Sequence, residues 1–132
     1  MPSGRAQAYT YDARGNITST THEPTPGSGD AARVEYAGYD ATCANTFKCN
    51  KPNYYIDARG GVTDYTYDAA GNLLTETRPA PTPGAARPQT RYTWEQRFAW
   101  YKRDASGTIS QADSPVWVQT GSSQCMTGST CQ

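Results

Sequence analysis

Aromatic and polar residues alternate most clearly in the stretch Tyr-Thr-Tyr-Asp-Ala-Ala-Gly-Asn-Leu-Leu, which begins at Tyr65. Tyr65 and Tyr67 are two positions apart, so both rings lie on one face of a strand. Asp68 and Gly71 suit the first and fourth positions of a type I turn, because the carboxylate accepts backbone hydrogen bonds and the glycine adopts the left-handed conformation. Since the apolar pattern resumes at Leu73, the stretch predicts a hairpin with a one-residue bulge.

This pattern occurs four times along the chain. In each copy an aromatic residue lies three positions before an aspartate, a glycine three positions after it and an apolar residue five positions after it. Repetition at this spacing predicts an array of similar hairpins. The predicted structural turns are formed by Asp12 and Gly15, Asp57 and Gly60, Asp68 and Gly71, and Asp104 and Gly107. Their repeat units lie near residues 9–21, 54–64, 65–77 and 101–111.

The segments between the repeats complete the predicted sheet. Proline and glycine cluster in residues 22–30 and 78–88, which predicts two surface loops, the second a stiff spacer. Residues 34–39 read as a return strand and residues 116–118 as a short one. We therefore predict an all-β fold in which residues 1–132 form a single antiparallel β-meander of about eight to ten short strands.

The composition favours strands and narrows the classes of partner. The chain has 10 Tyr and 3 Trp, but leucine only at Leu73 and Leu74, so it suits a half-exposed sheet and not helices around an aliphatic core. Lys plus Arg equals Asp plus Glu at 12 each, which argues against a nucleic-acid partner. No run approaches the roughly 20 apolar residues of a membrane span, and the first residues lack the features of a signal peptide.

Two of the repeats carry the hexapeptides Tyr-Asp-Ala-Arg-Gly-Asn, at residues 11–16, and Tyr-Asp-Ala-Ala-Gly-Asn, at residues 67–72. These resemble the YD repeats of RHS proteins, a repeat type shared by Tc-type toxin components and teneurins. The resemblance implies a piece of a larger β-sheet that spirals into a shell. Many RHS proteins also have a self-cleaving acidic site at the end of the shell. Asp113-Ser114-Pro115 does not match that site, which favours an internal fragment of the repeat region.

The function that this resemblance implies is structural. A repeat segment of a large exported or cell-surface protein, bacterial by the resemblance, would help to enclose a toxin cargo or mediate cell contact. Its partners would be flanking repeats or other copies, because the outer strands of a cut sheet carry unpaired backbone groups. The sequence contains no Gly-x-Ser-x-Gly elbow, P-loop or His-Glu-x-x-His motif, so we predict no enzymatic activity and no cofactor.

The four cysteines form two Cys-x5-Cys pairs, Cys43 with Cys49 and Cys125 with Cys131. Four cysteines allow three pairings, and closure within each short loop is the simplest. Disulfides would indicate an oxidising compartment. Free thiols and a metal site remain alternatives, although zinc sites more often have shorter cysteine spacing and a nearby histidine.

An aromatic segment follows the second proline-rich loop. Tyr92, Trp94, Phe98 and Trp100 share one parity in a strand, which predicts an aromatic stripe on one face. Such a stripe could stack on carbohydrate, which is the alternative function, or it could pack against a neighbouring repeat.

Two further features resemble ligand sites. His22, the only histidine, is expected to be an exposed loop residue, since only Glu23 lies near it in the sequence. The aspartate turns superficially resemble calcium loops, but each offers one Asp and at most one Asn, whereas calcium needs six or more oxygens. We therefore predict no metal site.

Overall fold

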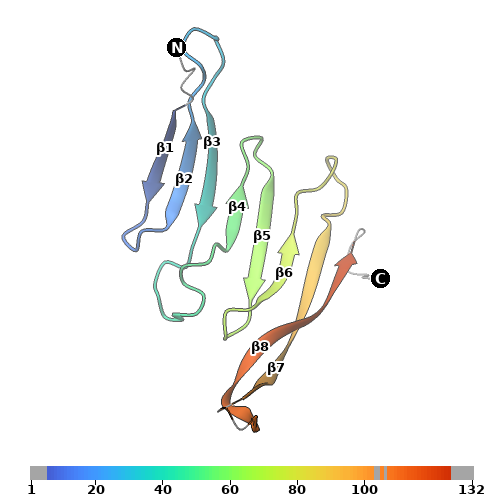
Figure 1. The fold of residues 1–132 in the computed structure, drawn as a ribbon. Coiled ribbons are helices and arrows are strands. Elements are labelled where there is room, and N and C mark those ends of the chain that lie inside the picture. The colour runs from blue at the N-terminus through green and yellow to red at the C-terminus, as the bar shows by residue number, and fades with distance from the viewer. Residues whose placement is uncertain (1–5, 103–104, 106, 126–132) are drawn as a thin grey trace.

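The computed structural model of the chain describes residues 6–102, 105 and 107–125. These residues form one sheet of eight antiparallel strands, in which each strand pairs with its neighbours in the sequence (Figure 1). They include no helix, and hence none long and apolar enough to cross a membrane. The predicted all-β antiparallel meander is therefore confirmed. The strands are β1 (Gln7–Tyr11), β2 (Ile17–His22), β3 (Arg33–Gly38), β4 (Tyr54–Ile56), β5 (Val62–Tyr67), β6 (Leu73–Thr77), β7 (Gln89–Lys102) and β8 (Ile109–Cys125).

Because consecutive strands run in opposite directions, their connections alternate between the two ends of the sheet. The turns after Asp12 and Asp68 lie at the lower ends of the strands in Figure 1, with the 39–53 loop between them. The turn after Asp57 lies at the upper ends, between the two proline-rich loops. The three aspartate turns are thus divided between opposite ends of one sheet.

The prediction of uniformly short strands is wrong for the last hairpin. Strand β7 has 14 residues and β8 has 17, so residues 116–118 belong to β8 and do not form a separate short strand. Strand β6 pairs with β7 only at Arg91, Thr90 and Gln89, whereas β7 and β8 stay paired as far as Lys102 and Ile109. The two strands therefore continue past β6 as a two-stranded ribbon, which is clear in Figure 1. The fourth predicted turn includes Asp104, which lies outside the described residues.

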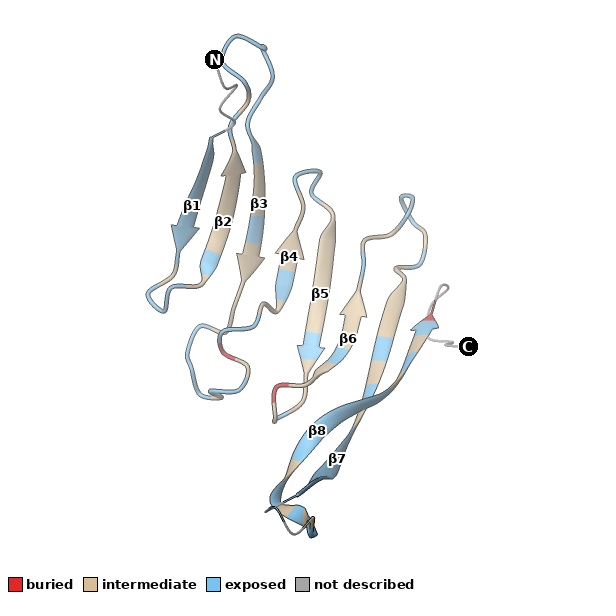
Figure 2. Cartoon of the chain, in the orientation of Figure 1, coloured by how far each residue is buried: buried red, intermediate tan, exposed pale blue. Residues whose placement is uncertain are grey.

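The sheet is a single layer with almost no core. Among the described residues only Cys49 and Cys125 have fully buried side chains, and every strand is half-buried or exposed along nearly all of its length (Figure 2). A sheet normally buries at least one face against a second layer. Of the exposed large hydrophobic side chains that the structure describes, half lie on the β7–β8 hairpin: Phe98, Trp100, Tyr101, Ile109, Val116, Trp117 and Val118. The hydrophobic effect therefore contributes little to this sheet unless other polypeptide covers it.

Candidate functional site: the aspartate turns and the cysteine loop

The turn that begins at Asp68 shows how each repeat reverses the chain. The amide of Gly71 donates to the carbonyl of Asp68 at 3.1 Å, and the amide of Asp68 donates to the carbonyl of Asn72 at 3.0 Å. Gly71 has a φ of 80°, in the left-handed region that favours glycine. The Asp68 Oδ1 atom accepts the amides of Ala70 and Asn72, both at 2.9 Å, while Oδ2 accepts the Asn72 side-chain amide at 2.9 Å. The turn is therefore a type I turn followed by a glycine bulge.

The turns at Asp12 and Asp57 have the same backbone bonds. Gly15 and Gly60 have φ values of 86° and 83°, and their amides donate to the aspartate carbonyls at 3.0 and 2.9 Å. The turn at Asp57 has Gly61 where the other two have asparagine, so it lacks the extra side-chain bond to the carboxylate. In the fourth repeat Gly107 also has a positive φ, of 82°.

The hydrogen bonds within the turns also lower the pKa values of the three aspartates. The side-chain bond from Asn16 is the main reason that the pKa of Asp12 lies below its ordinary value, and the backbone amide of Gly61 has the same effect on the pKa of Asp57. At Asp68 partial burial opposes the shift, but the bonds from Asn72 and the neighbouring amides still lower the pKa. At Asp12 and Asp68 these donors occupy both carboxylate oxygens, and at Asp57 they occupy Oδ1. The described residues contain no group of three or more potential metal ligands.

The 39–53 loop, which joins β3 to β4, contains a disulfide between Cys43 and Cys49 with a Cα–Cα distance of 4.9 Å. The residue Cys43 is exposed, while Cys49 has no exposed surface. Cys125 is also disulfide-bonded. The partner expected from the sequence, Cys131, lies outside the described residues.

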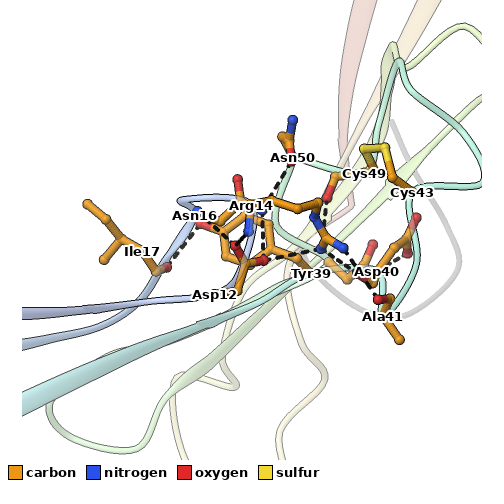
Figure 3. Close-up of polar contacts among 11 residues, drawn as sticks. Asp12, Arg14, Asn16, Ile17, Tyr39, Asp40, Ala41, Cys43, Cys49 and Asn50 are labelled. Atoms are coloured by element: carbon orange, nitrogen blue, oxygen red, sulfur yellow. Dashed lines mark hydrogen bonds and ion pairs between the residues drawn. A yellow bond between two sulfur atoms is a disulfide. The ribbon is translucent and has the colours of Figure 1, made fainter.

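Arg14, in the first aspartate turn, holds one side of this loop (Figure 3). Its guanidinium group donates to the carbonyls of Asp40 at 2.5 Å, Ala41 at 3.3 Å and Cys49 at 3.5 Å. It also forms an ion pair with Asp12 at 3.2 Å. One arginine therefore joins the carboxylate of its own turn to three carbonyls of a loop about 30 residues further along the chain.

The other side of the loop contacts the turn at Asp68. The side-chain amide of Asn45 donates to the carbonyl of Ala69 at 2.9 Å, and the Lys51 ammonium group donates to the carbonyl of Gly71. A Cβ atom placed on Gly71 would overlap the carbonyl oxygen of Phe47 and lie 2.9 Å from its carbonyl carbon. Backbone of the loop and backbone of the turn are thus in direct contact, and only glycine leaves room for it.

The 39–53 loop therefore bridges two hairpins that are not neighbours in the sheet, β1–β2 and β5–β6. Sequence reasoning identified its cysteines but missed Arg14 and Lys51 as its anchors. Arg59 occupies the position of Arg14 in the turn at Asp57, yet that turn lies at the opposite ends of the strands. No local signal separates the two arginines, because the difference depends on which end of the sheet each turn occupies.

At the upper ends a second arginine plays a comparable part. The Arg87 guanidinium group donates to Asp64 Oδ2 at 2.6 Å and to the carbonyls of Val62 at 2.5 Å and Thr77 at 3.0 Å. It also donates to the carbonyl of Arg78 at 3.0 Å. The 78–88 loop, predicted as a plain spacer, is therefore tied to β5 and β6 at its base.

The aromatic stripe is divided in the structure. Tyr92 and Trp94 are half-buried, and Trp94 Nε1 donates to the carbonyl of Leu73 at 2.8 Å. Phe98 and Trp100 are 43% and 67% exposed, and an irregular register between them interrupts the ladder. The four residues therefore do not form one continuous platform. Trp117 of β8 was missed by sequence reasoning; it pairs with Gln96 and lies on the same face as Phe98.

His22 was expected in an exposed loop, and this expectation is wrong. It is the last residue of β2 and pairs with Gln7 and Arg33 on the strands beside it. The Gln7 side-chain amide lies 3.0 Å from Nδ1 of the ring, and Glu35 of β3 lies 3.5 Å from Nε2. Sequence proximity pointed to Glu23, because the cross-strand neighbours depend on the register.

Comparison with known protein families identifies the segment that contains two of the aspartate turns. Residues 55–82 match the family model of the RHS Repeat. This chain carries an RHS repeat. The matched segment runs from β4 through β6 into the second proline-rich loop, and it contains the turns at Asp57 and Asp68. The RHS repeat is a structural rather than a catalytic family. No curated protein and no solved structure matched the chain.

Proposed function

We propose that the chain is a wall segment of a larger RHS-type protein, exported or displayed at the cell surface. In this proposal the sheet continues into flanking repeats, and the assembled wall encloses a toxin cargo or presents a surface for cell contact. The observation that carries the proposal is the single-layer sheet, in which only two described side chains are fully buried. RHS repeats usually occur in exported or cell-surface proteins, which supports the location.

The edges of the sheet support continuation in both directions. Strand β1 is exposed along its whole length, and β8, with 17 residues, pairs with a strand on one side only within the described part of the chain. An open edge presents unpaired backbone N–H and C=O groups, which pair readily with another strand. We therefore expect these edges to bind flanking repeats in the parent protein and other copies when the chain is studied alone.

Light scattering over a range of concentrations tests this expectation. The wild-type chain should associate as its concentration rises. Lysine substitutions in the edge strands, Ala8→Lys and Val116→Lys, should reduce the association, because a charge disfavours strand addition. Thr25→Lys, in a loop, is the matched control and should leave association unchanged. A wild-type chain that stays monomeric at high concentration would refute the proposal.

The two roles of the wall can be separated in the parent protein. If the shell encloses cargo, a protease should cut the cargo only after the shell has been opened by denaturant. If the shell mediates cell contact, the intact protein should bind cells and lose no binding when the cargo is removed.

A second candidate function, carbohydrate binding, has one observation in its favour. Trp100 is 67% exposed and Phe98 is 43% exposed, and aromatic faces of this kind stack on the apolar faces of sugar rings. A glycan array should show selective binding that Trp100→Ala removes. Trp94→Phe is the control, because Trp94 is half-buried and its indole nitrogen is already bound to a carbonyl. Equal binding by wild type and Trp100→Ala would exclude this function for the ribbon.

A further inference from the structure

The 39–53 loop occupies the lower ends of the strands, between the turns at Asp12 and Asp68. Arg14 bonds it to the first turn, while Asn45 and Lys51 bond it to the second. At its ends the loop also bonds the adjoining strands, through Tyr39 to Ile17 and through Pro52 and Asn53 to β5. Apart from that of Lys51, however, its bonds to the two turns come from residues 40–50, in or beside the ring that the disulfide closes. The shape of that ring therefore bears directly on the bonds to both turns.

We propose that the Cys43–Cys49 disulfide is a thiol-exchange site, and that its reduction releases the 39–53 loop from the two aspartate turns beside it. The reductant would be a dithiol supplied from outside the chain. Cys43 is the accessible half of the bond. Cys49 is fully buried, its amide donates to the carbonyl of Asn45 at 2.9 Å and its own carbonyl accepts from Arg14.

The chemistry follows from this asymmetry. A thiolate of the dithiol attacks the Cys43 sulfur, the sulfur–sulfur bond breaks, and Cys49 leaves as a thiolate that takes up a proton. The second thiolate of the dithiol then displaces Cys43 from the mixed disulfide, and Cys43 is protonated in turn. The protein gains two electrons and two protons, and the dithiol becomes a disulfide.

Opening the ring affects the two turns because most of the bonds to them are made by residues in or beside the ring. The closed ring limits the conformations of the seven residues 43–49. Once it opens, the carbonyls that face Arg14 and the amide of Asn45 are no longer held opposite their partners. The turn at Asp57 lies at the other ends of the strands and has no bond to this loop among those described, so it should not respond.

Hydrogen exchange tests the proposal. The experiment uses the full chain with Cys125→Ser and Cys131→Ser, so that Cys43–Cys49 is the remaining disulfide, before and after addition of dithiothreitol. We expect exchange of the turn amides at residues 68–72 to increase by about tenfold or more, as local opening allows, while residues 57–61 change little. Unchanged exchange at residues 68–72, or an equal increase in both turns, would overturn the proposal.

Two further measurements test which sulfur is attacked and whether the loop acts through its bond to the turn at Asp68. With a limiting amount of glutathione, mass spectrometry should find the mixed disulfide on Cys43, and an adduct mainly on Cys49 would contradict the proposed attack. Asn45→Ala leaves the disulfide closed but removes one bond to the turn at Asp68. It should raise exchange at residues 68–72 under oxidising conditions, and the effect of dithiothreitol should then be smaller than in the parent chain.

Discussion

Replacing Gly71 with alanine should destabilise the fold in two ways, one through the backbone and one through steric contact. The first is the left-handed backbone, which alanine adopts at a cost of about 1–2 kcal/mol, partly offset by a stiffer unfolded chain. The second is steric, because the new methyl group would overlap the carbonyl of Phe47 in the 39–53 loop. Overpacking of this kind costs about 1–3 kcal/mol. We therefore expect Gly71→Ala to destabilise the chain by about 2–4 kcal/mol.

Gly15→Ala and Gly60→Ala are matched controls for the first cost alone. Both glycines have φ values close to that of Gly71, but a methyl group on either would have no atom within 4 Å. In each control the free energy of unfolding should fall by about 1 kcal/mol.

Urea unfolding, followed by tryptophan fluorescence at one low protein concentration, measures the difference. The midpoint of Gly71→Ala should fall clearly below the midpoints of both controls, with similar slopes. Equal midpoints for all three variants would refute the argument that the turn at Asp68 is in tight contact with the loop.

Three other changes test separate contacts. Arg87→Lys should lower the free energy of unfolding by about 1–3 kcal/mol in urea titrations, since an ammonium group cannot reproduce the several bonds of the planar guanidinium group; unchanged stability would show that the proline-rich loop is not held by this side chain. The pKa of Asp68 in the folded chain lies below its ordinary value of 3.8. The carboxylate of Asp68 therefore stabilises the fold fully at pH values above 3.8, and this stabilisation is lost as the pH falls through the lowered pKa. Stability measured from neutral pH down to about pH 2 should therefore fall less steeply in Asp68→Ala than in wild type, and parallel curves would contradict the assignment. Trp94→Phe should lower the free energy of unfolding by about 1 kcal/mol, because it loses the hydrogen bond to the carbonyl of Leu73. Trp100→Phe, at a largely exposed site, should leave the urea midpoint unchanged. Equal losses of stability in the two variants would contradict the different environments of Trp94 and Trp100.

The sequence by itself determined the class of the fold and the order of its strands. An Asp-x-x-Gly turn forms its bonds within five residues, so the signal for each reversal is local and readable. Short alternating segments joined by such turns pair with their neighbours, and a meander follows.

Tertiary structure decided which distant residues meet. Arg14 and Arg59 occupy the same position in their repeats, but only Arg14 lies at the end of the sheet that holds the 39–53 loop. His22 meets Glu35 because the register of β2 on β3 places them together. The lengths of β7 and β8 likewise depend on mutual pairing beyond the reach of β6. Arg14 and Asp40, like His22 and Glu35, lie more than ten positions apart in the sequence. A one-residue change of register would remove such a contact without altering the local pattern.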